Sequence, residues 1–424
     1  MISLIIPTHN RCLSLQRLLD ALQKQTYPLD DLEVVVVADG CQDNTIEMLE
    51  KYEAPFKLVF LEQPGSGAAV ARNKGAEKAS GSLLIFLDDD IKPSEYFVEA
   101  HVRAHSQKPD QVVIGYLPPK LANQSSFFQI RLWAWWEEKF YIMGKAGHRY
   151  TYEDLLSGNF SLPASLFQQV GGFDSRFRCR EDYELGARLL KAGADLIFVK
   201  AAMGDHCDEV TDLDRSLRRK RQEGKADILF GRCHPDLMYK LRVASFGESS
   251  PWLEKIVQKF IFQFSQWTDL LAFVLRALLN LLEMLKMRQT WEKLNNRLHG
   301  YWYLRGMIDE LKTYKGLISY LQGGEIRPNS EGLEIEIDLK QGLEKAEQLI
   351  DEQRPVSLRI RYGEHPIGRI APCSGAERLR SVHLRPLLMT DFAWQLLQAV
   401  NLETSSQDIL LPFNTQKQLD LVNL

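Results

Sequence analysis

The sequence lacks the features that mark several classes of protein. Its six cysteines include no Cys-x-x-Cys pair, so no cysteine-based metal site is indicated. No secretory signal precedes the first expected strand, and we therefore expect free thiols in a reducing cytoplasm. The net charge of −4 gives no general signal for binding polyanions such as nucleic acids. The apolar stretch around residues 265–284 is interrupted by Asp269, Arg276 and Glu283, so it does not predict a membrane-spanning helix.

What the sequence does contain is a run of three consecutive carboxylates. Residues 83–87 form an apolar segment of the β type that stops at Asp88, Asp89 and Asp90. In a parallel sheet such a strand delivers the carboxylates to the carboxyl edge, where open α/β folds bind their ligands. Three like charges are costly there unless a cation offsets them, and Mg²⁺ or Mn²⁺ would in turn hold a diphosphate. The alternative is a solvated cluster that caps a helix beginning near Pro93.

The upstream residues make this strand the fourth in an alternating series of strands and helices. Extended apolar segments cover residues 2–7, 32–38 and 57–61, and helical patterns carry Leu15, Leu18, Leu19 and Leu22 and then residues 68–79. Such an alternation predicts an α/β fold with a parallel, doubly wound sheet.

Six short motifs follow one another in an order that is similar to a known family. They are residues 5–11 (IIPTHNR), 36–40 (VVADG), 71–73 (ARN), 86–90 (FLDDD), 171–174 (GGFD) and 181–182 (ED). Over roughly the first 240 residues the chain resembles the family 2 glycosyltransferases, inverting enzymes with the GT-A nucleotide-sugar fold. It departs from the family at Ala38, where a second acid is common, and at Cys41-Gln42, which replace small hydroxyl residues.

The resemblance implies roles for residues on the donor side. The residues implied to bind the nucleotide sugar are Pro7, Thr8, Asn10, Arg11, Asp39, Arg72, Asp88 and Asp89. Asp39 would accept a hydrogen bond from the nucleobase, and the turn of residues 7–11 would line the base pocket. Asp88 would bind the ribose or the metal, and Asp90 would be the firmest ligand of Mn²⁺ or Mg²⁺. Arg72 would pair with phosphate through its planar fork, or would be an ordinary residue on a helix surface.

An inverting transfer also needs a general base for the acceptor hydroxyl. The best candidate is Asp182, at the start of a helical pattern, because a helix N-terminus keeps a carboxylate ionised. The motif of residues 171–174 precedes it at the family's spacing. The alternative is that Glu181 and Asp182 are simply acids favoured in a first helical turn.

Other residues are predicted to complete the site. His206 follows a strand over residues 196–199 and would join the metal shell or touch the diphosphate, with a structural role as the alternative. The basic run of residues 215–221 would close over the diphosphate or form a solvated face, and nothing around it favours binding to nucleic acid. The resemblance places Asn159, Glu181, Trp135 and Trp136 on the acceptor side, with core packing as the alternative for the aromatic residues.

Three regions are predicted along the chain. Residues 1–240 would form the GT-A domain with its mostly parallel sheet, and residues 250–322 would form a helical extension. Residues 325–424 would form a small α+β or mostly-β domain. In that domain, apolar and polar residues alternate over residues 333–339 and 356–362, as they do in strands. One face of the extension carries Leu270, Phe273, Val274, Ala277, Leu278 and Leu281. This face would pack inward or lie on a membrane surface, and we expect packing.

Taken together, these patterns predict a hexosyltransferase-type enzyme. It would be an inverting, metal-dependent glycosyltransferase that moves a sugar from a nucleoside diphosphate donor, expected to be UDP-linked, to a saccharide or lipid-linked acceptor in envelope polysaccharide or glycolipid assembly. The expected location is the cytoplasm, with the inner face of the membrane as an alternative. Two other functions stay open. A nucleotidyltransferase would need a glycine-rich, lysine-bearing loop that residues 8–14 do not offer, and a non-catalytic saccharide-binding protein would keep the acids as relics.

Overall fold

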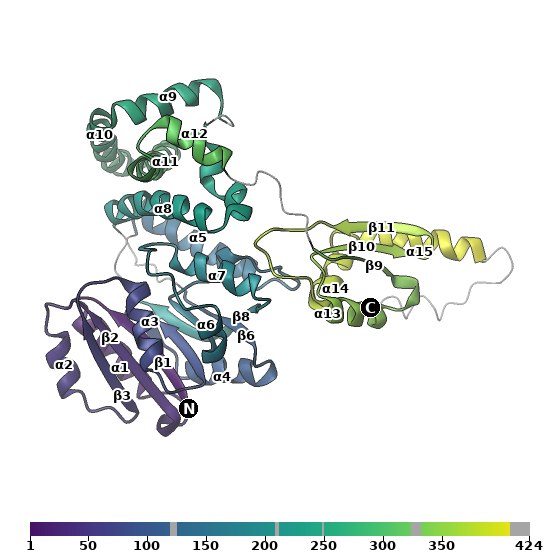
Figure 1. Cartoon of the computed structure of the whole chain (residues 1–424), viewed down its shortest axis with the longest axis horizontal. Coiled ribbons are helices and arrows are strands. Elements are labelled where there is room, and N and C mark those ends of the chain that lie inside the picture. Colours follow the sequence, from purple (N-terminus) through teal and green to yellow (C-terminus); the bar gives the residue numbers. More distant parts are fainter. Residues whose placement is uncertain (119–124, 208–211, 248–249, 324–331, 408–424) are drawn as a thin grey trace. The chain divides into compact units, whose positions relative to one another are not determined.

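The computed structural model describes residues 1–118, 125–207, 212–247, 250–323 and 332–407. Their contacts divide them into two compact units (Figure 1). The first unit contains the described residues of 1–144 and 150–323 together with 374–377, and the second contains those of 145–149, 332–373 and 378–407. Residues 325–331 and 408–424 of the predicted C-terminal domain lie outside the described residues.

The first unit is built on an eight-stranded sheet with the order β3-β2-β1-β4-β7-β6-β8-β5. The strands are β1 (Ile2–Thr8), β2 (Leu32–Asp39), β3 (Lys57–Gln63), β4 (Leu83–Leu87), β5 (Ile91–Pro93), β6 (Gln111–Tyr116), β7 (Asn159–Pro163) and β8 (Asp195–His206). The four predicted strands β1 to β4 pair in parallel as one block. β7 runs antiparallel to both β4 and β6, and β8 pairs in parallel with β6. The predicted doubly wound, mostly parallel sheet is confirmed.

Helices connect these strands and bury one apolar face each. They are α1 (Cys12–Leu22), α2 (Thr45–Lys51), α3 (Ala68–Lys78), α4 (Phe97–Gln107), α5 (Phe127–Met143), α6 (Ala164–Gln169) and α7 (Glu181–Lys191). The predicted spacing of Leu15, Leu18, Leu19 and Leu22 is the buried face of α1. The helix expected near Pro93 begins only at Phe97, because residues 91–93 pair with the distant end of β8 instead.

A helical layer follows the sheet in the same unit. It comprises α8 (Leu213–Cys233), α9 (Trp252–Gln263), α10 (Ser265–Met284), α11 (Arg288–Leu311) and α12 (Tyr314–Gln322), so the predicted helical extension is confirmed. Within the described residues, no helix is long and apolar enough to cross a membrane.

One prediction about this layer is wrong. The face of α10 that was expected to pack inward carries Leu270, Phe273 and Val274, and these side chains are 59%, 64% and 61% exposed. The face of α10 that is buried carries Ala272, Leu279 and Leu282. Both faces of this helix are apolar, so hydrophobic spacing alone did not identify the one that packs.

Two glycines let α8 and α11 approach closely. A Cβ atom on Gly306 would lie 1.9 Å from the carbonyl oxygen of Arg221, and one on Gly224 would lie 2.1 Å from that of Tyr303. Backbone atoms cannot yield as a flexible side chain does, so the two positions require glycine for the helices to stay in contact.

We predict that Gly306→Ala lowers the thermal unfolding midpoint, with a loss of about 1–3 kcal/mol because the methyl group forces the two helices apart. The matched control is Gly300→Ala on the same helix, where the new atom would meet only the flexible end of Arg242 at 3.1 Å. That variant should be neutral or gain up to about 1 kcal/mol from the higher helix propensity of alanine. Equal midpoints for the two variants would contradict the close packing of α8 on α11.

The second unit is α+β, one of the two predicted alternatives. Its sheet has the order β11-β10-β9 and consists of β9 (Glu334–Asp338), β10 (Ser357–Tyr362) and β11 (His365–Ile370). The strands alternate as the sequence predicts, since Ile335, Ile337, Leu358 and Ile360 form the core. Among the described residues of this unit, the α-helices are α13 (Leu343–Gln353), α14 (Ser381–Met389) and α15 (Ala393–Gln407).

Candidate functional site

The three carboxylates lie at the carboxyl edge of the sheet, as predicted. Because β1 and β4 are parallel neighbours, the turn after β1 meets the turn after β4. The hydroxyl of Thr8 donates to Asp89 Oδ2 at 2.7 Å. The Arg11 guanidinium contacts Asp89 Oδ1 at 3.0 Å and Asp90 Oδ2 at 2.6 Å. The motif of residues 7–11 and the acid cluster therefore form one site, in which an arginine offsets part of the negative charge.

Arg72 offsets a further part of that charge. Its side chain on α3 is 3% exposed and donates to Asp88 Oδ1 at 2.7 Å and to Glu181 Oε1 at 3.0 Å. The reading of Arg72 as a surface residue is therefore wrong, and its contact with phosphate stays a prediction. Since Glu181 begins α7, this buried arginine joins the acid cluster to the helix that carries the candidate base.

Asp39 organises the loop that leads into α3. Burial opposes ionisation of its carboxyl group, but hydrogen bonds from the Gln63 side chain and the amides of Ser66 and Gly67 outweigh burial, so the pKa of Asp39 is lowered. The next residue, Gly40, has a φ of +70°, and a Cβ there would lie 2.7 Å from the nitrogen of Gly65. The end of β2 is thereby fixed against this loop. Binding of Asp39 to a nucleobase stays a prediction.

The turn after β1 is fixed against the turn after β2. Asn10 has a φ of +54°, and its side-chain oxygen accepts a hydrogen bond from the amide of Gln42 at 2.6 Å. The backbone amide of Asn10 donates to the sulfur of Cys41 at 3.4 Å. The Cys41-Gln42 pair, a departure from the family's pattern, thus takes part in the same turn-to-turn contact. Pro7, within β1, is half-buried beside it.

Asp90 and His206 are brought together by the pairing of β5 with β8. His206 lies opposite Ile91 in that pairing, and its Nε2 is 3.8 Å from Asp90 Oδ1. This oxygen is buried and accepts no hydrogen bond from the described residues. An unpartnered buried carboxylate oxygen beside an imidazole suits a divalent cation, because Mg²⁺ often takes one or two protein ligands and completes its shell with phosphate and water.

A complete metal cage is not present in the described residues. Within them, no three His, Cys, Asp or Glu side chains are arranged to hold an ion. Asp88, predicted as a further ligand, is held instead by Arg72. The residues that fit a cation are therefore Asp90 and His206, and the remaining ligands would have to come from the substrate and from water.

Asp182 lies in the first turn of α7 and is partly exposed. Its Oδ1 accepts a hydrogen bond from the amide of Tyr183 at 2.9 Å. Burial and then the neighbouring charge of Glu181 raise the pKa of Asp182 to about 6, while Arg219 on α8 and Arg72 act in the opposite direction. Burial and the neighbouring charge thus make this carboxyl group more basic than an ordinary aspartate.

A buried network that the sequence did not indicate holds the start of α7. Arg180 precedes the helix with a φ of +64°, which is uncommon for a residue with a side chain. Its guanidinium lies 2.9 Å from Asp227 and 3.2 Å from Glu223, both on α8. Tyr303 of α11 donates to Asp227 from the other side at 2.5 Å. No local pattern signals this arrangement, because its members are far apart in sequence.

The basic run of residues 215–221 divides between two roles. Lys220 pairs with Glu223 at 2.6 Å, and Arg221 pairs with Asp309 of α11 at 2.7 Å, so these residues serve packing. Arg219 is 70% exposed and acts electrostatically on Asp182.

The predicted acceptor residues are placed differently from one another. Trp135 is 46% exposed, whereas Trp136 is half-buried and stacks on Phe140 with ring centroids 5.6 Å apart. Asn159 is fully buried, and its amide bonds to His101 and to the carbonyl oxygen of Ala202. The structure therefore does not bring Asn159 to a solvent-accessible acceptor site.

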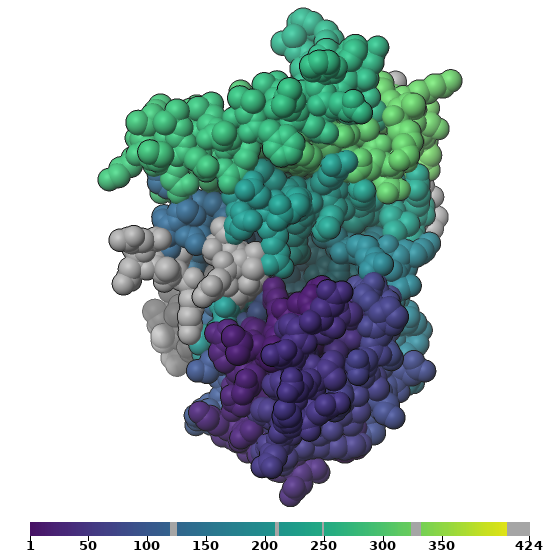
Figure 2. Space-filling model, turned by 90° about the vertical axis from the view of Figure 1, so that its left-hand side faces the viewer, coloured from purple at the N-terminus to yellow at the C-terminus, as the bar shows by residue number. Residues whose placement is uncertain are grey.

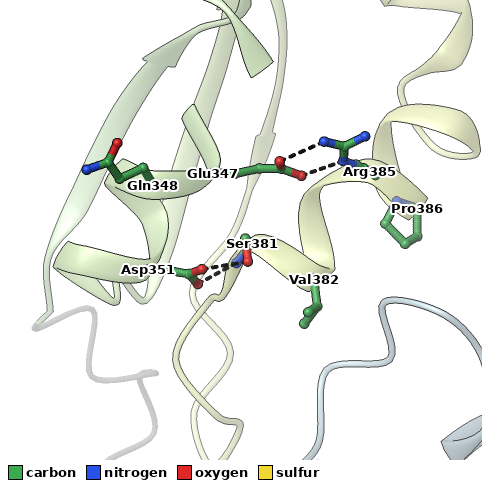
Figure 3. A pocket seen from close by; sticks show the side chains of 7 residues that line it. All are labelled: Glu347, Gln348, Asp351, Ser381, Val382, Arg385 and Pro386. Atoms are coloured by element: carbon green, nitrogen blue, oxygen red, sulfur yellow. Dashed lines mark hydrogen bonds and ion pairs between the residues drawn. The ribbon is translucent and has the colours of Figure 1, made fainter. Parts of the chain in front are cut away.

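The second unit has a pocket of its own, between α13 and α14 (Figure 3). It is lined by Glu347, Gln348, Asp351, Ser381, Val382, Arg385 and Pro386. Glu347 forms a two-point ion pair with Arg385 at 2.6 and 2.9 Å, and Asp351 accepts two hydrogen bonds from Ser381. Both carboxylates of this pocket are engaged inside it, whereas the first unit has the buried Asp90 Oδ1, which accepts no hydrogen bond from the described residues. The first unit therefore holds the better candidate site.

Comparison with known families agrees with this choice. Residues 3–171 match the family described as glycosyl transferase family 2, and residues 139–209 match the one described as the N-terminal domain of galactosyltransferase. Over residues 3–171 the chain is therefore similar to glycosyltransferase family 2. The two matched ranges contain the acid cluster, Asp182 and His206 between them.

Curated relatives are also glycosyltransferases. The chain is 33% identical to a validoxylamine A glucosyltransferase of Streptomyces hygroscopicus over 57% of this chain and 63% of the relative. It is 27% identical to glycosyltransferase AglE of Haloferax volcanii over 54% of this chain and 73% of the relative. The chain spans about three fifths of the length of the two validoxylamine A glucosyltransferases that it matches, 63% and 58%.

Solved structures show more distant similarity. A mannosyltransferase of Pyrobaculum calidifontis in complex with GDP-Man and Mn²⁺ aligns with a TM-score of 0.48 and 16% identity, over 73% of this chain and 86% of that one. TarS of S. aureus, residues 1–349 with UDP-GlcNAc, aligns with a TM-score of 0.43 and 18% identity, over 77% and 93%.

Proposed function

We propose that the protein is an inverting glycosyltransferase that moves a sugar from a nucleoside diphosphate to the hydroxyl group of a saccharide or lipid-linked acceptor in envelope polysaccharide or glycolipid assembly. UDP is the nucleotide to test first, and the cytoplasm is the proposed place of action. The observation that carries the proposal is the bridge from Asp88 through Arg72 to Glu181. This bridge joins the carboxylate-rich donor side of the site to α7, the helix that carries Asp182, whose pKa is raised.

On the donor side, the chain fixes the nucleotide by two interlocked turns. The Thr8–Arg11 turn and the loop held by Asp39 are each rigidified by hydrogen bonds, so binding would need little further ordering. Asp90 and His206 would hold Mg²⁺ or Mn²⁺, which when bound offsets the charge that develops on the diphosphate leaving group. Arg11 and Arg72 keep the neighbouring carboxylates paired.

On the acceptor side, Asp182 takes the proton of the attacking hydroxyl group. Its Oδ1 accepts a hydrogen bond from the backbone amide of Tyr183, and its pKa of about 6 keeps it deprotonated at neutral pH. Glu181 cannot serve as well, because Arg72 engages its carboxylate. Arg180 and its partners on α8 hold the helix, and therefore the base, in position.

We predict that Asp182→Asn keeps the fold and the affinity for nucleotide but slows transfer by roughly 10²- to 10⁴-fold, since an amide cannot accept the proton. Single-turnover transfer and calorimetric affinity for UDP check this. Asp110→Asn, an exposed residue in a loop, is the matched control and should transfer at the normal rate. Near-normal transfer by Asp182→Asn would place the base elsewhere, and loss of UDP affinity would place Asp182 among the donor ligands.

The pH profile should follow the raised pKa of Asp182. Because the deprotonated form is active, kcat/KM should be constant above pH 7 and should fall about tenfold per unit well below pH 6. Burial also raises the pKa of Asp89 to about 6, so a second variant is needed. The fall in kcat/KM at acidic pH should persist in Asp89→Asn and should be absent from the residual activity of Asp182→Asn. The opposite pattern would assign this fall to Asp89.

We also predict that Asp90→Asn weakens nucleotide binding in Mn²⁺ but leaves it unchanged in EDTA, because the lost carboxylate oxygen would act through the ion. Calorimetry with UDP measures both conditions. The matched comparison is Asp89→Asn, whose carboxylate is held by Thr8 and Arg11 and whose loss should alter the metal dependence little. An equal loss of affinity with and without metal would show that Asp90 does not bind a cation.

A further inference from the structure

Helix α9 is oriented with its apolar side outward. Trp252, Ile256 and Phe260 are 68%, 55% and 51% exposed, whereas the polar Gln258 is 5% exposed. The buried amide of Gln258 is held by hydrogen bonds with the amide of Gly247 and the hydroxyl of Ser250. A surface helix of a soluble domain normally has the reverse arrangement, with its apolar stripe inward.

Helix α10 continues the same surface. Trp267, Phe273 and Val274 are 73%, 64% and 61% exposed along a helix of 20 residues. We call the surface formed by the exposed apolar side chains of α9 and α10 the apolar ridge; it includes Trp252, Ile256, Phe260, Trp267, Phe273 and Val274. Figure 2 shows the green helical layer across the end of this unit opposite the purple N-terminal strands. A soluble monomer usually exposes apolar residues singly, whereas in the ridge they are gathered on two consecutive helices. Large exposed apolar patches mark surfaces that bind proteins or membranes.

The charged residues of α10 point away from the ridge. Asp269 pairs with Arg305 at 2.8 Å, and Arg276 pairs with Asp214 at 2.6 Å. Glu283 accepts a hydrogen bond from the amide of Phe127. The charges that prevent α10 from spanning a bilayer thus fasten it to α5, α8 and α11, and its outward side stays apolar.

The charges beside the ridge are mostly basic. Lys255 and Lys259 lie on α9, with Lys259 over the ring of Tyr314, and Lys286 lies at the turn between α10 and α11. Arg288 is already paired with Glu292 at 2.9 Å, and Glu254 is the exposed acid of α9. In a symmetric dimer each ridge would meet its own copy, and the basic residues would be brought together. Anionic headgroups complement them instead, and tryptophan favours the interface between headgroups and acyl chains.

We propose that the apolar ridge of α9 and α10 binds the surface of an anionic lipid membrane. The tryptophan and phenylalanine side chains enter the interface, and the flanking lysines contact the headgroups. Helices α10 and α11 pack on the starts of α5 and α8 in one core that includes Phe128, Leu217 and Trp291, so α10 shares a core with the helix that carries Arg219. If the proposed function holds, this contact keeps the transfer site near lipid-linked acceptors.

Flotation of the full chain with vesicles tests the proposal without any measurement of transfer, so it can fail independently of the proposed function. The wild type should float with vesicles of phosphatidylcholine and phosphatidylglycerol and much less with phosphatidylcholine alone. Trp267→Glu/Phe273→Glu should lower binding at least tenfold. The matched control is Met389→Glu/Trp394→Glu in the second unit, where the side chains are 70% and 68% exposed, and it should bind as the wild type does.

Two further measurements keep the result interpretable. Circular dichroism should show unchanged helix content in the ridge and control variants, because the altered side chains are exposed. Lys286→Glu, at an exposed position, should weaken the preference for anionic lipid. The proposal is overturned if the wild type does not bind vesicles, or if the ridge and control variants bind equally. It is also overturned if sedimentation in the absence of lipid gives a stable dimer that the ridge variant converts to a monomer.

Discussion

The charge balance around the three carboxylates at the end of β4 is the constraint on which the site depends. Placed together at the sheet edge, Asp88, Asp89 and Asp90 would repel one another and resist ionisation. Arg11 and Arg72 pair with these carboxylates and offset part of that repulsion. Removing either arginine would leave buried or half-buried carboxylates without a partner, which is far more costly than losing a surface ion pair.

The same balance links the parts of the site. Because Arg72 also holds Glu181, the position of α7 follows from the position of the acid cluster. Arg180 then ties the start of α7 to Asp227 and Glu223 of α8, and Tyr303 ties α8 to α11. A continuous set of polar contacts thus runs from the sheet edge to the helical layer that carries the apolar ridge. Asp182, the proposed base, and the exposed helices thus belong to the same compact unit.

Local patterns were sufficient to predict the strands β1 to β4 and α1, because alternation and helical spacing depend only on neighbours in sequence. The motif residues came from the resemblance to a known family. Local patterns failed where a distant partner decides the outcome. β5 forms because its residues pair with β8, and Arg72 is buried because Asp88 and Glu181 surround it. Asn159 has an amide engaged by His101 and Ala202, and α10 has two apolar sides, of which contacts with other helices select one. None of these facts has a signature in the adjacent residues.

The most direct test of the central claim is to locate the cation and the nucleotide in crystals. Anomalous scattering from crystals grown with Mn²⁺ and UDP would place both in a single experiment. The account predicts one manganese peak between the diphosphate and the side chains of Asp90 and His206, with Arg72 still joining Asp88 to Glu181. A diphosphate bound without manganese, or a manganese peak remote from Asp90, would contradict it.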